Sequence, residues 1–143
     1  MNIKTKEDYL RVIYSLYETL EDKSDGVRTS DIAKLLEVTK PTVSRGIRSL
    51  TKESLLNSES YSRISLTNKG MIEAEKIMYK HRLIEMFLIK KLNYKIEELR
   101  GVVHNEAHEL EHSFSDESIR RIDKMLNYPK KTSSGKIIPR GKC

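Results

Sequence analysis

The chain has 143 residues, of which 34% are charged and 37% are hydrophobic, and its formal net charge is +6. This length suits one compact domain or two small ones, and no apolar run approaches the roughly 20 residues of a membrane span. The charged start, MNIKTKEDYL, leads us to expect no signal peptide. Cys143 is the single cysteine, which excludes an internal disulfide framework and favours a reducing cytoplasm.

The positive charge is unevenly distributed along the chain. Residues 128–143 carry five basic and no acidic groups, so most of the excess lies there and the net charge alone is weak evidence for nucleic acid. Between residues 38 and 70, however, six basic side chains stand against two acidic ones, a local charge of +4. Such a local excess predicts an electrostatic footprint for phosphates.

Apolar residues at helical spacing predict a first helix over residues 6–20, followed by a polar loop. From Thr29 to Leu50 the pattern predicts two helices separated by a tight turn at residues 37–39. Thr39 is a good N-cap for the second of them, and Pro41 lies in its first turn, where its missing N–H costs nothing. On the first of the two helices, four apolar side chains are expected to face inward: Ile32, Ala33, Leu35 and Leu36.

Two short extended runs over residues 56–66 predict a hairpin. The order helix, turn, helix, hairpin is that of a winged helix-turn-helix, whose second helix enters the DNA major groove by its N-terminal turn. Arg45 is the best candidate for reading a base, because a guanidinium bonds guanine O6 and N7 in a bidentate manner. The candidate DNA contacts are Thr39, Lys40, Pro41, Thr42, Ser44, Arg45, Arg48 and, on the hairpin, Arg63.

The second half of the chain predicts three further helices, over residues 71–92 and 95–113 and from Ser115 onward. On the middle helix, five residues are expected to face inward: Ile96, Leu99, Val103, Ala107 and Leu110. These helices carry more apolar surface than so short a domain hides alone, which favours a homodimer. Pro129 ends the regular structure, and the basic segment 129–143 is expected to form a flexible tail.

All four histidines gather with carboxylates in two groups. At about 100° per residue, one face of the middle helix presents His104, His108, Glu111 and His112. On the preceding helix, His81 and Glu85 have the i, i+4 spacing. Imidazole and carboxylate without thiolate suit a divalent ion such as Mn²⁺, Fe²⁺ or Zn²⁺, so we predict a metal site.

Residues 108–112 also match the zinc-protease signature H-E-x-x-H, with Glu109 as general base. A catalytic zinc needs a third protein ligand, yet no histidine lies downstream, and the later acids are too close for the usual protease arrangements. We therefore expect no enzyme. The protease is the last alternative, behind a metal-independent winged-helix regulator that responds to a small ligand.

Four segments carry a family resemblance: TKEDYLRVIYSL, DIAKLLEVTKPTVSRGIRSL, KHRLIEMFL and HNEAHELEHSFSDESIRRI. Together they resemble the diphtheria toxin repressor and manganese transport regulator family over residues 3–128. Members are dimeric, metal-activated winged-helix repressors of metal-uptake genes. The resemblance implies a cytoplasmic homodimer that binds operator DNA with one or two Fe²⁺ or Mn²⁺ ions per subunit, in the short form without the SH3-like domain of longer members.

The resemblance also implies a ligand set, consisting of Asp8, His81, Glu85, His104, His108, Glu111 and His112. The resemblance groups Asp8 with His108, Glu111 and His112, so that Asp8 connects the first helix to the metal. The second group consists of His81, Glu85 and His104. Two departures leave the choice between Fe²⁺ and Mn²⁺ open. Arg11 stands where manganese-type members place a glutamate ligand, and His108 fits neither branch.

The expected fold is mainly α, with a winged helix-turn-helix DNA-binding domain over residues 1–72. A helical dimerisation and metal-binding domain follows over residues 73–128, and then the basic tail over residues 129–143.

Overall fold

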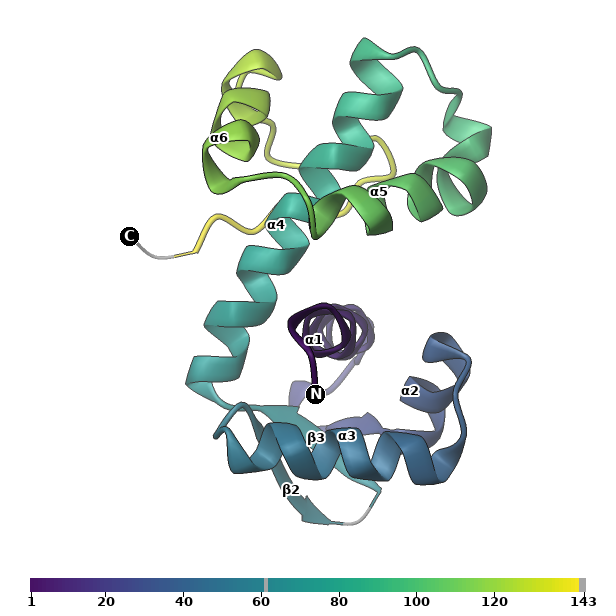
Figure 1. Cartoon of the computed structure of the whole chain (residues 1–143), viewed down its shortest axis with the longest axis vertical. Coiled ribbons are helices and arrows are strands. Elements are labelled where there is room, and N and C mark those ends of the chain that lie inside the picture. The colour runs from purple at the N-terminus through teal and green to yellow at the C-terminus, as the bar shows by residue number, and fades with distance from the viewer. Residues whose placement is uncertain (61, 142–143) are drawn as a thin grey trace. The chain divides into compact units, whose positions relative to one another are not determined.

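The computed structural model describes residues 1–60 and 62–141, so Cys143 lies outside the described residues (Figure 1). The chain divides into two compact units, Met1–Glu75 and Lys76–Cys143. The boundary falls inside the long helix α4 (Asn68–Lys91). Among the described residues, no helix combines the length and apolar character that crossing a membrane requires.

The first unit is a winged helix-turn-helix, which confirms the predicted fold. Its elements are α1 (Ile3–Glu18), the 3-10 turn η1 (Lys23–Asp25), β1 (Val27–Arg28), α2 (Thr29–Leu36), α3 (Lys40–Lys52), β2 (Leu56–Ser60) and β3 (Arg63–Leu66). The strands form an antiparallel sheet in the order β1-β3-β2. The two-residue strand β1 was not predicted, because so short a run has no alternation to read.

Helix α1 packs on α3 at a point where only glycine fits. A Cβ atom at Gly46 would lie 2.5 Å from the ring of Tyr9. The Tyr9 hydroxyl donates to the carbonyl oxygen of Thr42, 3.3 Å away in the first turn of α3. The position of α3 in this unit is therefore set directly by α1.

One side chain of α2 was wrongly assigned to the core, because Leu35 is 55% exposed. Ile32 and Ala33 are buried and Leu36 is half-buried, and at 100° per residue Leu35 points well away from their common direction. The helix then ends at once, since Glu37 adopts a left-handed conformation with φ of 56°.

The second unit surrounds one hydrophobic core. Besides the end of α4 it contains the 3-10 turn η2 (Ile96–Glu98), the π-helix η3 (Leu99–Val103), α5 (His104–Glu111) and α6 (Asp116–Met125). The core side chains are Leu83, Ile84, Met86, Leu88, Val103, Ala107, Ile119, Ile122 and Ile138.

The predicted continuous helix over residues 95–113 is wrong in its first half. The chain there forms a 3-10 turn and then a π-helix, and regular α-helix begins only at His104. Because the 100° spacing does not hold through these turns, Ile96 is not brought to the face of Val103 and is 45% exposed.

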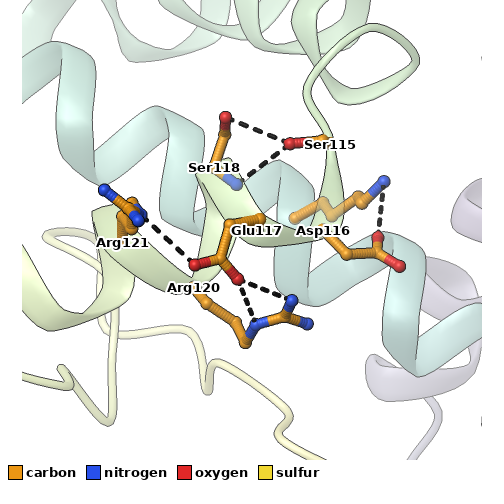
Figure 2. Close-up of polar contacts among 7 residues, drawn as sticks. Ser115, Asp116, Glu117, Ser118, Arg120 and Arg121 are labelled. Carbon is orange, nitrogen blue, oxygen red and sulfur yellow. Dashed lines mark hydrogen bonds and ion pairs between the residues drawn. The ribbon is translucent and has the colours of Figure 1, made fainter.

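Helix α6 begins with a complete cap (Figure 2). The Ser115 hydroxyl accepts the N–H of Ser118 at 3.1 Å. Glu117 accepts hydrogen bonds from both Arg120 and Arg121 one turn later. Lys80 pairs with Asp116 at 3.2 Å, which ties this end of α6 to α4.

Residues 130–141, predicted to lie in a flexible tail, instead pack within the second unit. Ile138 is 3% exposed within the core, and Ile137 accepts a hydrogen bond from Arg82 at 2.5 Å through its carbonyl oxygen. Arg140 pairs with the buried carboxylate of Asp123. The prediction relied on the basic composition of this segment and overlooked Ile138, the apolar residue that anchors it.

Candidate DNA-binding face and metal centres

Helix α3 has one buried face and one exposed face. Val43, Ile47 and Leu50 are buried. The helix has four basic and no acidic residues, KPTVSRGIRSLTK, so its outer face is cationic. The exposed members of the predicted DNA set are Thr39, Lys40, Pro41, Ser44, Arg45 and Arg48 on or beside α3 and Arg63 on β3, whereas Thr42 is half-buried.

The first turn of α3 is held by its own side chains. The hydroxyl oxygen of Thr39 accepts the N–H of Thr42 at 3.3 Å and caps the helix. Arg45 donates to the hydroxyl of Thr42 at 3.4 Å, which orients its guanidinium along the exposed face. Sequence reasoning did not single out Tyr9 and Gly46 behind this turn, although a glycine inside a helix was a signal of close packing.

The first group of ligand-type side chains, here called the His81 cluster, consists of His81 and Glu85 on α4 and His104 at the start of α5. One donor atom from each lies within 4.8 Å of the others. The two oxygens of Glu85 face different imidazoles, with Oε1 3.5 Å from His81 Nε2 and Oε2 3.6 Å from His104 Nδ1.

The second group, here called the Glu111 cluster, consists of His108, Glu111 and His112 at the end of α5. Their donor atoms also lie within 4.8 Å of one another. His112 Nε2 is 3.8 Å from Glu111 Oε1, and the rings of His108 and His112 meet edge to face with centroids 5.4 Å apart. Glu111 is 1% exposed, whereas Glu109 is on the exposed side of the same helix.

Burial and hydrogen bonding act in opposite directions on the pKa of His81 and on the pKa of Glu85. Burial by itself lowers the pKa of His81, but hydrogen bonds with Glu111 and Glu85 outweigh it and raise the pKa above the usual 6.5. Burial likewise favours a higher pKa for Glu85, yet hydrogen bonds with His104 and His81 bring it down to about 2. Glu85 is therefore a carboxylate at neutral pH.

The donor chemistry of both clusters fits a divalent cation. Each combines two imidazoles with one shielded carboxylate and no sulfur, a set that suits Mn²⁺, Fe²⁺ or Zn²⁺. Shielded carboxylates need a compensating positive charge, and imidazoles that ligate a metal are neutral, so the ion itself would supply that charge.

The remaining predicted ligand, Asp8, lies in α1 of the first unit and is half-buried. Its assignment to the Glu111 cluster stays a prediction. Arg11, one turn further along α1, is buried.

Two family models together match nearly the whole chain. The model described as iron dependent repressor, N-terminal DNA binding domain, matches residues 1–64. The model described as iron dependent repressor, metal binding and dimerisation domain, matches residues 67–140.

Individual relatives agree with these matches. The iron-dependent repressor IdeR of Mycobacterium leprae is 37% identical over 139 residues, which cover 96% of this chain and 56% of that protein. The transcriptional regulator MntR of Oceanobacillus iheyensis is 32% identical over 138 residues, 94% of this chain and 85% of that protein. The solved structure of the manganese regulator SloR has a TM-score of 0.77 and 41% identity, covering 94% of this chain and 59% of that one.

This chain thus spans little more than half the length of the IdeR protein that it matches. From its two matched domains and these relatives, the chain belongs to the iron-dependent repressor family.

Proposed function

We propose that this chain is a metal-dependent transcriptional repressor that binds operator DNA and controls genes for metal uptake, with Fe²⁺ or Mn²⁺ as co-repressor. The observation that carries the proposal is the presence, in one chain, of a cationic recognition helix and two shielded imidazole–carboxylate clusters. The relatives' names support it, since one is an iron-dependent repressor and another solved relative is a manganese-dependent transcriptional repressor.

The exposed face of α3 is the proposed reading surface for DNA. Arg45 bonds a guanine edge, while Pro41 and the methyl group of Thr42 contact thymine methyls. Phosphates are held by Lys40, Ser44, Arg48 and, from the wing, Arg63, which position the protein without specifying sequence.

The two clusters are the proposed binding sites for the co-repressor. The Glu111 cluster holds one ion together with Asp8, and the His81 cluster holds a second. A bound ion would supply the positive charge that these carboxylates need, and Asp8, as one of its ligands, would connect α1 with the ligands on α5. Because Tyr9, the neighbour of Asp8, contacts α3 at Gly46 and Thr42, fixing α1 also fixes the first turn of the recognition helix.

A homodimer in the cytoplasm is the proposed working form. The second unit exposes the apolar side chains of Leu92, Ile96 and Val102, which a second copy would cover. Two-fold symmetry places two recognition helices on half-sites about one DNA turn, roughly 34 Å, apart. We propose no catalytic role for any residue.

Selection from random-sequence DNA tests this function. The full chain is incubated with the DNA pool and Mn²⁺ without oxygen, and the enriched sequence is titrated by fluorescence anisotropy in EDTA, Mn²⁺, Fe²⁺ and Zn²⁺. Ionic strength is held fixed, because phosphate contacts make affinity depend on salt. We expect a palindromic site bound roughly 5–150-fold more tightly with Mn²⁺ or Fe²⁺ than in EDTA.

Two outcomes contradict the proposal in different ways. Equal affinity in EDTA and in metal would favour the regulator that responds to a small ligand. Failure to enrich any sequence would refute DNA binding itself.

A further inference from the structure

We infer that Glu111 is a positioning residue for the His81 cluster as well as a ligand of its own cluster, so that one carboxylate couples the two proposed metal centres. This inference rests on the proposed function only in assuming that the clusters hold divalent ions. It concerns side chains of the second unit alone.

The two oxygens of Glu111 have different partners. Oε2 is 3.2 Å from His81 Nδ1, in the His81 cluster, whereas Oε1 is directed to His112, in the Glu111 cluster. Both ends of the link between clusters are shielded from water, since His81 is 4% exposed and Glu111 is 1% exposed. Water therefore competes little for this hydrogen bond, which holds the carboxylate and the ring in one mutual orientation.

The hydrogen bond also decides which nitrogen of His81 is available to a metal. This contact is a hydrogen bond in which Nδ1 carries the proton and the carboxylate oxygen of Glu111 accepts it. When His81 is neutral, the lone pair is then on Nε2, the nitrogen that faces Glu85 at 3.5 Å. A histidine that ligates a metal commonly donates its other N–H to a carboxylate, which fixes the tautomer and strengthens the ligand.

Removing Glu111 should therefore weaken metal binding by the His81 cluster, in which Glu111 is not a ligand. Loss of such a supporting carboxylate typically costs roughly 10–100-fold in metal affinity. Removing His108 and His112, by contrast, dismantles the Glu111 cluster and leaves the bond between His81 and Glu111 in place. This difference separates positioning by Glu111 from any effect of an ion in the neighbouring cluster.

The test uses the full chain with His108→Ala and His112→Ala, so that only the His81 cluster remains. Mn²⁺ is titrated, and free Mn²⁺ is measured by electron paramagnetic resonance. Adding Glu111→Ala should weaken binding roughly 10–100-fold, and Glu111→Gln, which keeps the shape and one acceptor oxygen, should weaken it less. Glu109→Ala is the matched control, because it removes an exposed carboxylate from the same helix and should leave the affinity unchanged.

A second readout needs no metal. Long-range ¹H–¹⁵N NMR of the metal-free chain, at a pH where His81 is neutral, should show the Nδ1–H tautomer in the wild type and a mixture in Glu111→Ala. An unchanged tautomer, or equal weakening by Glu109→Ala and Glu111→Ala, would overturn the inference. Absence of Mn²⁺ binding in the wild type would instead refute the proposed function, and the NMR comparison would still decide the role of Glu111.

Discussion

Single residues on α5 differ sharply in their surroundings although they are close in sequence. Glu111 is buried between two groups of imidazoles, while Glu109, two residues earlier, faces solvent. The sequence pattern H-E-x-x-H draws attention to Glu109, but helical geometry places the buried carboxylate at Glu111. Helical spacing placed His104 on one face with His108 and His112, whereas the structure groups His104 with His81 and Glu85. The packing of α4 against α5 also brings Glu111 to His81, which spacing alone does not show.

This difference gives the first prediction. Glu111→Ala should abolish the tightening of operator binding by Mn²⁺ or Fe²⁺, because the Glu111 cluster loses its carboxylate and the His81 cluster its support. Glu109→Ala should keep the metal response within about twofold, an effect smaller than about 0.5 kcal/mol. Fluorescence anisotropy on the selected operator measures both variants. A metal response that depends on Glu109 and not on Glu111 would contradict this assignment.

The titration of His81 and Glu85 predicts how the stability of the metal-free chain depends on pH. The pKa of His81 is raised above 6.5 in the folded state, so its contribution is complete below pH 6.5 and is lost as pH rises through the raised pKa. The pKa of Glu85 is lowered from 4.5 to about 2, so its contribution is complete above pH 4.5 and is lost as pH falls toward 2.

Urea unfolding in EDTA between about pH 5 and about pH 9 should therefore show a free energy of unfolding that declines on the alkaline side. In the His81→Gln variant, the part of this decline that His81 causes should disappear. Bound metal should act in the opposite direction, because ligation needs neutral imidazole and strengthens as pH rises. A decline of the same size in His81→Gln would show that other groups cause it.

At the scale of elements, the contact between α1 and α3 is the one that links the proposed metal ligand to the recognition helix. Gly46→Ala places a methyl group against the Tyr9 ring, and the two helices must separate. We expect a loss of about 1–3 kcal/mol in the free energy of unfolding, the usual cost of overpacking. Gly101→Ala is the control, since a Cβ atom there meets nothing within 4 Å. Urea unfolding of both variants measures the difference, and equal stabilities would refute the role of this contact.

Elements with strong local signals were predictable from the sequence, and elements defined by packing were not. The cap at Thr39 and the apolar spacing of Val43, Ile47 and Leu50 define α3 by local rules. The π-helix at residues 99–103 follows no such local rule. Ile138 was overlooked for the same reason, since its burial requires a surface that α4 and its neighbours provide only after folding.

The candidate site divides in the same way. Periodicity placed His104, His108, Glu111 and His112 on one helix face. The family resemblance instead assigned His104 to the group of His81 and Glu85, where the structure has it. The hydrogen bond between Glu111 and His81 joins residues 30 positions apart. No spacing on a single helix predicts such a contact, which arises from the packing of two helices.

At the scale of the whole molecule, we propose that metal and operator DNA stabilise the same state of the chain. If both bind preferentially to that state, each must raise the affinity of the other by the same factor. Ionic strength changes the nonspecific attraction of the chain to phosphates. It acts on DNA binding alone, so it does not raise the affinities for metal and for operator by the same factor.

The most direct test is isothermal titration of Mn²⁺ into the full chain, with and without saturating operator DNA at one ionic strength. We expect the operator to tighten Mn²⁺ binding by the same factor, roughly 5–150, by which Mn²⁺ tightens operator binding. Identical Mn²⁺ affinities with and without operator would contradict this coupling, because metal would then bind the chain without changing its affinity for operator DNA.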